Sequence, residues 1–254
     1  MARFENYSSK FETIKLRRED GILEMRLHSD DGPLRWSLTA HDELEEAFLE
    51  IGRDPENEVL ILTGTGEEFS GPDVDPGASG QRAISASEFD QIARVGKNML
   101  MNLLNIEVPV IGAVNGPARR HPELPLMSNI VLASEDAIFQ DPAHFRGGMV
   151  PGDGVHVVFP YLMGATRASY FLLTAQELGA LEAKEAGLVN EVLSKARLLP
   201  RAWELARMLL RQPTRVRRFS RQLLTHEIKC RMHAQLGHGF ALEAYAQIAS
   251  GART

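Results

Sequence analysis

The sequence predicts an α/β fold with a helical C-terminal region, and two kinds of pattern support this. Short apolar runs at Val59–Leu62 and Val108–Val114 are typical of strands that are buried on both faces. Around these runs, and through most of the chain beyond Pro151, apolar residues recur at helical spacing. Strands that alternate with helices in this way predict parallel βαβ units.

The N-terminal segments follow a different pattern. Apolar and polar residues alternate around Ile14–Leu16 and again over Leu23–Leu27, with a turn at Asp20–Gly21 between them. This spacing predicts two antiparallel strands. A helix should follow, with apolar residues from Leu44 to Ile51 on one face and Thr39 placed to cap its start.

Loops and helices are then expected to alternate with the buried strands. The Gly-, Pro- and Asp-rich stretch Gly64–Gly80 predicts a loop, and helical spacing from Phe89 to Leu103 predicts a second amphipathic helix. Helix and strand alternate again over Leu124–Ala133, and Ile138–Phe139 predicts a further short strand.

Composition excludes several classes of protein. The chain has 254 residues, 44% of them hydrophobic, and its net charge of −6 gives no general attraction to nucleic acid or to anionic lipid. The single Cys230 forms neither an internal disulfide nor a thiolate zinc site. Residues 1–10 are polar and no run reaches membrane-spanning length, so we expect a cytoplasmic protein.

Two familiar functional motifs are incomplete or absent in this sequence. Thr63–Gly66 follows a strand as a dinucleotide turn would, but the third glycine is missing and Glu67 and Glu68 stand where a pyrophosphate needs positive charge. No Gly-x-Ser-x-Gly elbow is present, which argues against a serine hydrolase of that type.

Two of the eight histidines have a setting that suggests a site. His121 and His144 each follow a predicted buried strand, where α/β sheets place their ligands, whereas the other six lie on ordinary strand or helix segments. Asp153 lies in a glycine-rich run shortly after His144. A carboxylate among glycines can approach a ring closely, so a His144–Asp153 pair competes with the simpler interpretation of Asp153 as a turn residue.

The chain resembles the crotonase superfamily, which includes enoyl-CoA hydratases and isomerases, from about Phe11 to about Ser250. The resemblance rests on several stretches taken together: Val110–Ala118, Glu123–Leu126, Ile130–Ala133, Phe139, Pro142, Gly148–Gly152 and the segment from Leu178 to Val192. It implies a crotonase-like spiral of ββα units, usually assembled as a homotrimer or a dimer of trimers. We therefore expect a core over residues 1–195 and a helical oligomerisation region over residues 196–254.

Departures from the superfamily pattern indicate the chemistry. Members that act on coenzyme A thioesters usually carry glycines just before the position of Glu123, where backbone N–H groups form an oxyanion hole. Here Arg119–Pro122 replace those glycines. In the earlier loop Pro72 has no N–H to donate, and His144 stands where a hydratase has its second catalytic Glu. Glu123 matches a hydratase catalytic Glu, but it also fits a charge at a helix start.

This combination is similar to the β-diketone hydrolase branch of the superfamily, which includes 6-oxocamphor hydrolase. The stretches that carry the similarity are His121–Glu123, His144–Phe145, Val150–Gly154, Leu199–Ala206, and Trp36 shortly before Thr39–Leu44. The resemblance implies hydrolysis of a carbon–carbon bond in a bicyclic β-diketone, giving a keto acid. It also implies a small-molecule diketone as the partner, with no cofactor and no metal.

Retro-Claisen cleavage of this kind requires a base for water, donors to the attacked carbonyl and a proton for the departing enolate. We expect His144 to be the base, with Asp153 either its partner or the relay of the proton to the enolate. His121 and the indole N–H of Trp36 are the candidate oxyanion donors, although Trp36 also fits a core position. Glu243 shares a helical face with Leu236 and Phe240, and the resemblance implies that it meets His144 and helps hold its protonated form. A solvent-facing Glu243 is the alternative.

Three other functions remain open at this point. The first is an acyl-CoA hydratase, isomerase or thioester hydrolase on the same fold. The second is a metalloenzyme that uses His121, His144 and Asp153 as ligands. The third is a non-catalytic binding module, for which the acidic net charge argues against RNA as the partner.

Overall fold

The computed structural model describes residues 2–74 and 85–251. The strands are β1 (Ile14–Glu19), β2 (Ile22–Leu27), β3 (Leu34–Trp36), β4 (Val59–Thr63), β5 (Ser70–Val74), β6 (Val110–Val114), β7 (Ile130–Ser134), β8 (Ile138–Phe139), β9 (Leu178–Gly179) and β10 (Glu191–Leu193). The helices are α1 (Phe4–Tyr7), α2 (Leu38–Arg53), α3 (Ala86–Asn105), α4 (Glu123–Leu126), α5 (Val155–Met163), α6 (Ala165–Thr174), α7 (Ala180–Glu185), α8 (Lys195–Leu210), α9 (Thr214–Leu224) and α10 (His226–Gly251).

The main sheet has the order β1-β2-β4-β6-β7-β10 among the described strands. Strands β1 and β2 are antiparallel, as the alternating pattern predicts, and the remaining neighbours are parallel. β4 and β6 are buried along their whole length, which explains their continuous apolar runs. The prediction of an α/β fold with parallel units is confirmed.

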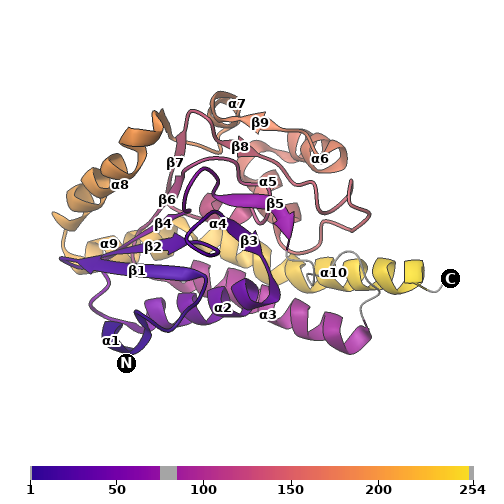
Figure 1. The fold of residues 1–254 in the computed structure, drawn as a ribbon, viewed down its shortest axis with the longest axis horizontal. Coiled ribbons are helices and arrows are strands. Elements are labelled where there is room, and N and C mark those ends of the chain that lie inside the picture. Colours follow the sequence, from indigo (N-terminus) through magenta and orange to yellow (C-terminus); the bar gives the residue numbers. More distant parts are fainter. Residues whose placement is uncertain (1, 75–84, 252–254) are drawn as a thin grey trace.

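Helices cover both faces of this sheet (Figure 1). α2 and α3 lie along one face, where Phe48, Leu60, Leu103 and Val110 belong to the larger core cluster. α8 lies on the other face, where its Trp203 packs in a smaller cluster with residues of β2, β4 and β6. α10 packs against α3 and α5, and its C-terminal end extends to the right in Figure 1, beyond β3 and β5.

Two local predictions were wrong. The cap of α2 is Ser37, whose side chain accepts a hydrogen bond from the Ala40 N–H, and Thr39 lies inside the helix. Part of the stretch expected as a loop, Ser70–Val74, forms strand β5 and pairs with β3. Residues 75–80 of that stretch lie outside the described residues.

The glycines of the failed dinucleotide motif have a structural role. A Cβ on Gly64 would lie 2.4 Å from Oδ1 of Asn115 and 2.7 Å from Cα of Phe69, so only glycine lets these loops pack together. Among the helices that the structure describes, none is long and apolar enough to cross a membrane.

Candidate active site

The junction between β3 and α2 contributes two aromatic side chains. Trp36 is the last residue of β3, and His41 lies in the first turn of α2 on the buried face that also carries Leu44 and Phe48. Burial, followed by the positive charge of His121, lowers the pKa of His41 to about 3. His41 is therefore neutral at physiological pH. Its position on an ordinary helical segment did not mark His41 as a site residue, but the structure places it in the candidate active site.

His121 lies in the loop between β6 and α4 with a backbone φ of +46°, in the left-handed region that non-glycine residues rarely adopt. Its ring stacks on the Trp36 indole with a centroid distance of 3.8 Å. Its Nδ1 lies 2.7 Å from Oε1 of Glu123. Such strain persists only where surrounding contacts enforce it, and these two contacts do so here.

Glu123 begins α4 and is fully buried. Burial raises the pKa of its carboxyl, an effect that His121 partly offsets. Burial opposes the charged form of His121, but the Glu123 carboxylate and Asp153 outweigh it and raise the pKa of the ring. His121 and Glu123 together therefore retain a shared proton at neutral pH. Because Nδ1 faces Glu123, the Nε2 of His121 is left for other partners.

His144 has a carboxylate partner that the sequence interpretation missed. Its Nδ1 lies 2.8 Å from both carboxylate oxygens of Asp141, three residues earlier, and both side chains are buried. A ring that donates Nδ1–H to a carboxylate is fixed in orientation and made more basic. The short spacing, Asp141-Pro142-Ala143-His144, was the available signal in the sequence.

Asp153 approaches the same ring from the other side. Its Oδ2 lies 3.3 Å from Nε2 of His144 and 3.8 Å from Nδ1 of His121. Burial disfavours the charged carboxylate, but His144, His121 and His156 outweigh burial and hold the pKa of Asp153 well below its usual range. The structure thus brings His144 and Asp153 together, as the sequence interpretation expects, with Gly154 turning the chain at a φ of +120° immediately afterwards.

Two carboxylates consequently flank one imidazole. Burial lowers the affinity of His144 for a proton, yet the charge on Asp153 and the hydrogen bonds from Asp141 and Asp153 raise its pKa well above the ordinary value. The resting ring is therefore an imidazolium near neutral pH. For His144 to act as a base, this proton must first leave.

Glu243 reaches the site from α10 because that helix packs very closely on the loop before Asp153. A Cβ on Gly152 would lie 2.4 Å from the Gly239 carbonyl oxygen, and one on Gly239 would lie 2.3 Å from the Gly152 carbonyl oxygen. Only two glycines allow this approach. The alternative of a solvent-facing Glu243 is wrong, since the side chain is buried.

Among the described residues, no hydrogen bond or ion pair joins Glu243 to His144, although both line the same cavity. Among the residues with described positions, none bonds to Oε2 of Glu243, and Asp141 takes the place beside His144 instead. Burial and the nearby charge of Asp153 raise the pKa of Glu243 to about 8. A largely neutral carboxyl does little to stabilise an imidazolium.

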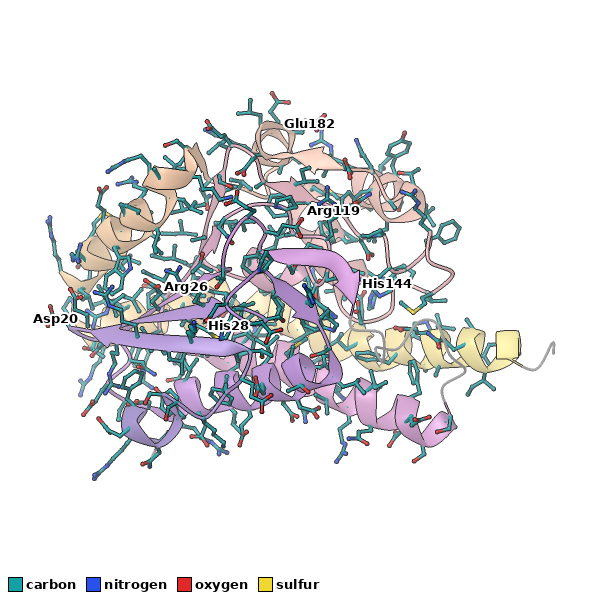
Figure 2. The ribbon with its side chains drawn as sticks, viewed as in Figure 1. Asp20, Arg26, His28, Arg119, His144 and Glu182 are labelled. Atoms are coloured by element: carbon teal, nitrogen blue, oxygen red, sulfur yellow. The ribbon has the colours of Figure 1, made fainter. Side chains whose placement is uncertain are left out.

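One cavity joins all five residues singled out from the sequence: Trp36, His121, His144, Asp153 and Glu243. His41, Arg120 and Asp141 also line it, and Phe89, Val155 and Phe240 supply apolar surface. Figure 2 marks the side chains of His144 and of Arg119, the neighbour of Arg120. The cavity therefore combines acid–base groups, N–H donors and an apolar wall, as a site for a small carbonyl compound requires.

Two backbone donors before His121 are already engaged. The Arg119 N–H donates to the Ser70 carbonyl at 2.9 Å, and the Arg120 N–H donates to Ser70 Oγ at 3.4 Å. These two backbone N–H groups are therefore not free to bind a carbonyl. In the part of the chain that the structure describes, no group of three or more His, Cys, Asp or Glu side chains is arranged to hold a metal ion.

Comparison with known proteins agrees with this architecture. The family model for enoyl-CoA hydratase/isomerase matches residues 17–247. A carnitinyl-CoA dehydratase from Shigella flexneri is 33% identical over 202 residues, which cover 78% of this chain and 75% of that protein. The protein of the same name from Escherichia coli K12 is 32% identical over the same length.

The chain therefore belongs to the enoyl-CoA hydratase/isomerase family, within the crotonase superfamily of enzymes. It is similar to a β-diketone hydrolase from the cyanobacterium Anabaena sp. PCC 7120, whose structure contains (S)-3-oxocyclohexyl acetic acid. The two share 42% identity with a TM-score of 0.91 over 95% of this chain and 96% of that one. An enoyl-CoA hydratase/isomerase from Mycobacterium paratuberculosis, 24% identical with a TM-score of 0.86 over 93% and 94% of the two chains, shares the fold.

Proposed function

We propose that this enzyme hydrolyses a carbon–carbon bond of a bicyclic β-diketone by a retro-Claisen reaction and releases a keto acid. The observation that carries the proposal is the pairing of His144 with Asp153 in the same cavity as the stacked Trp36 and His121. The 42% identity to a β-diketone hydrolase over nearly the whole chain supports it.

The first step is the addition of water to one carbonyl carbon. Neutral His144 takes a proton from water as the oxygen attacks, and Asp141 holds the ring through Nδ1 and stabilises the imidazolium that forms. Because His144 is protonated in the resting site near neutral pH, the reactive fraction of the enzyme grows as the pH rises.

The tetrahedral intermediate carries its charge on the former carbonyl oxygen. The indole N–H of Trp36 and Nε2–H of His121 are the donors proposed for that oxygen. The Glu123 partner keeps a proton on the His121 pair, so the ring can donate in the direction of the cavity. Loss of one such donor typically lowers kcat by about 100- to 1,000-fold, or about 2.7–4 kcal/mol of transition-state stabilisation.

In the second step the bond between this carbon and the carbon between the two carbonyl groups breaks. The electron pair passes to the second carbonyl as an enolate, and the attacked carbon becomes a carboxylic acid. Asp141 already orients His144, so Asp153 is not required for that task. We assign Asp153 to the return of the proton from His144 to the enolate carbon, which completes the addition of one water.

An acyl-CoA hydratase or dehydratase is the second candidate, because a carnitinyl-CoA dehydratase is 33% identical to this chain over 202 aligned residues. Against it, Ser70 occupies the backbone N–H groups of Arg119 and Arg120, and His144 replaces a catalytic carboxylate.

The two candidates are separated by parallel assays. The purified protein is incubated with the bicyclic 1,3-diketone whose hydrolysis gives 3-oxocyclohexyl acetic acid, and separately with carnitinyl-CoA and an enoyl-CoA. We expect a product that has gained one water from the diketone and no turnover of either thioester. Turnover of a thioester without cleavage of the diketone would overturn the proposal in favour of the second candidate.

A further inference from the structure

Arg120 is a cationic side chain of the cavity that none of the steps above uses. It lines the cavity beside His144 and Asp153 and is half-buried. Its Nε atom is buried without a hydrogen-bond partner, and no carboxylate of the described residues lies within ion-pair distance of its guanidinium. Arg119 differs, because it bonds to Gln140 Oε1 at 3.2 Å and to Glu177 Oε1 at 3.3 Å.

A partly buried guanidinium without a partner is costly, since burial removes hydration that nothing replaces. The charges of Asp141 and Asp153 favour the cation at Arg120 against this burial, although neither forms an ion pair with it. An arginine stays protonated under all ordinary conditions. The structure therefore maintains a fixed positive charge with free N–H donors at the cavity wall.

The proposed reaction has a matching chemical need. Retro-Claisen cleavage places negative charge on two oxygens in succession, first on the oxygen of the attacked carbonyl and then on the enolate oxygen of the second carbonyl. Trp36 and His121 are assigned to the first oxygen. The second oxygen requires its own donor at the moment when the carbon–carbon bond breaks.

We propose that the guanidinium of Arg120 hydrogen-bonds the carbonyl that water does not attack and stabilises the enolate that forms there. The inference rests on the proposed function. As the carbon–carbon bond breaks, its electron pair becomes the enolate double bond and the charge moves to the oxygen facing Arg120. Protonation on carbon then restores the ketone. Arg120 keeps its protons throughout, and water is the only co-reactant.

Hydrogen exchange in the product tests this assignment without the water-addition step. The keto acid (S)-3-oxocyclohexyl acetic acid is incubated with the enzyme in D₂O, and deuterium at the carbons next to the ketone is followed by NMR. Exchange requires proton removal from carbon and formation of the enolate, but no attack on a carboxyl carbon. A donor for the enolate oxygen is needed for exchange, whereas a donor for the attacked carbonyl is not.

The variants are Arg120→Gln, Arg120→Lys and, as a matched control on the neighbouring residue, Arg119→Gln. For Arg120→Gln we expect kcat for diketone hydrolysis and the rate of exchange at saturating keto acid to fall together by about 100-fold, the size typical of one lost oxyanion donor. Arg120→Lys should recover part of both rates. Arg119→Gln should match the wild type, and all three should unfold at similar temperatures.

A second comparison distinguishes the donor for the attacked carbonyl oxygen from the donor for the enolate oxygen. His121→Ala should slow hydrolysis strongly while leaving the exchange rate at saturation within a few-fold of the wild type. If Arg120→Gln keeps wild-type exchange at saturation, or only raises KM, Arg120 merely anchors a ligand and the inference is wrong.

Arg120→Gln could instead shift the pH profile of kcat/KM without lowering its plateau. That result would show that Arg120 acts through Asp141 and Asp153, and it would also overturn the inference about the enolate oxygen. A wild type inactive in both assays would overturn the proposed function itself, and the Arg120 assignment with it.

Discussion

The carboxylate of Asp141 accepts a hydrogen bond from Nδ1 of His144 at 2.8 Å, and both side chains are buried. This contact fixes which nitrogen of the ring faces the cavity. It leaves Nε2 directed at Asp153, 3.3 Å away. The arrangement resembles in kind the carboxylate–imidazole pairs that orient catalytic bases elsewhere, and it yields a prediction about pH.

Substitution of Asp141 should move the pH dependence of the reaction. Asp153 and Asp141 together raise the pKa of His144 well above its ordinary value of about 6.5. The acid limb of kcat/KM should therefore lie above that value in the wild type. Asp141→Asn removes one negative charge, so it should lower the pKa of His144 and shift the limb to lower pH. A pH–rate profile that is unmoved by Asp141→Asn would contradict the assignment of His144 as base.

Trp36→Phe should show whether Trp36 donates a hydrogen bond to the substrate or only shapes the cavity. Phenylalanine can still stack on His121 but has no N–H, so transition-state stabilisation is lost while packing is largely kept. We expect kcat to fall by about 100-fold with little change in KM, in line with the loss of one oxyanion donor. A rise in KM alone would mean that Trp36 only shapes the cavity.

Glu123→Gln should change the ionisation of His121. The buried carboxylate at 2.7 Å raises the pKa of the ring against the effect of burial. A glutamine has a similar shape without the charge, so the pKa of His121 should fall. Titration of the histidine resonances by NMR, with His41 as an internal reference that stays neutral, checks this shift. A pKa of His121 that is equal in both proteins would show that Glu123 does not hold the proton.

Glu243→Gln should stabilise the protein, and increasingly so at higher pH. Burial raises the pKa of Glu243 to about 8, above the value of about 4.3 expected in the unfolded chain. Between these two pH values the unfolded state releases a proton that the folded state keeps, so this carboxyl costs stability as the pH rises. Glutamine does not titrate. The stability gain of the variant over the wild type should therefore grow between pH 5 and pH 8 by about 1.4 kcal/mol for each pH unit at most.

Urea unfolding of both proteins at the two pH values measures this gain. A constant difference in the free energy of unfolding between wild type and variant would show that Glu243 is charged at neutral pH in the folded protein.

Patterns in the sequence predict the sheet and the helices because burial determines how apolar residues are spaced along each strand and helix. The runs at Val59–Leu62 and Val108–Val114 are typical of strands covered on both faces, and β4 and β6 lie there. The cap of α2 was misplaced because Ser37 and Thr39 are both good cap residues, and the choice depends on tertiary contacts. Strand β5 was missed because glycine and proline dominate Ser70–Val74, where pairing with β3 overrides local preference.

Site residues could be predicted where the neighbouring sequence distinguishes them from ordinary surface or core residues. His121, His144 and Asp153 follow strands or lie among glycines, and the structure brings them together. His41 was missed although it shares the buried helical face of Leu44 and Phe48, because a histidine on such a face is usually a core residue. The contacts of Glu243 could not be predicted from the spacing of residues along its helix. They depend on the close approach of Gly152 to Gly239, two residues that lie far apart in the sequence.

The proposed role of the His144–Asp153 pair is hydrolysis of a carbon–carbon bond between two ketones. The most direct measurement is the rate of keto acid formation from the bicyclic 1,3-diketone by the wild type, His144→Ala and Asp153→Asn, with thermal unfolding of each as a check on folding. We predict that the wild type forms a keto acid that has gained one water and that both variants remain folded and lose most of the activity. Near-normal rates in both variants, or an inactive wild type, would contradict the account.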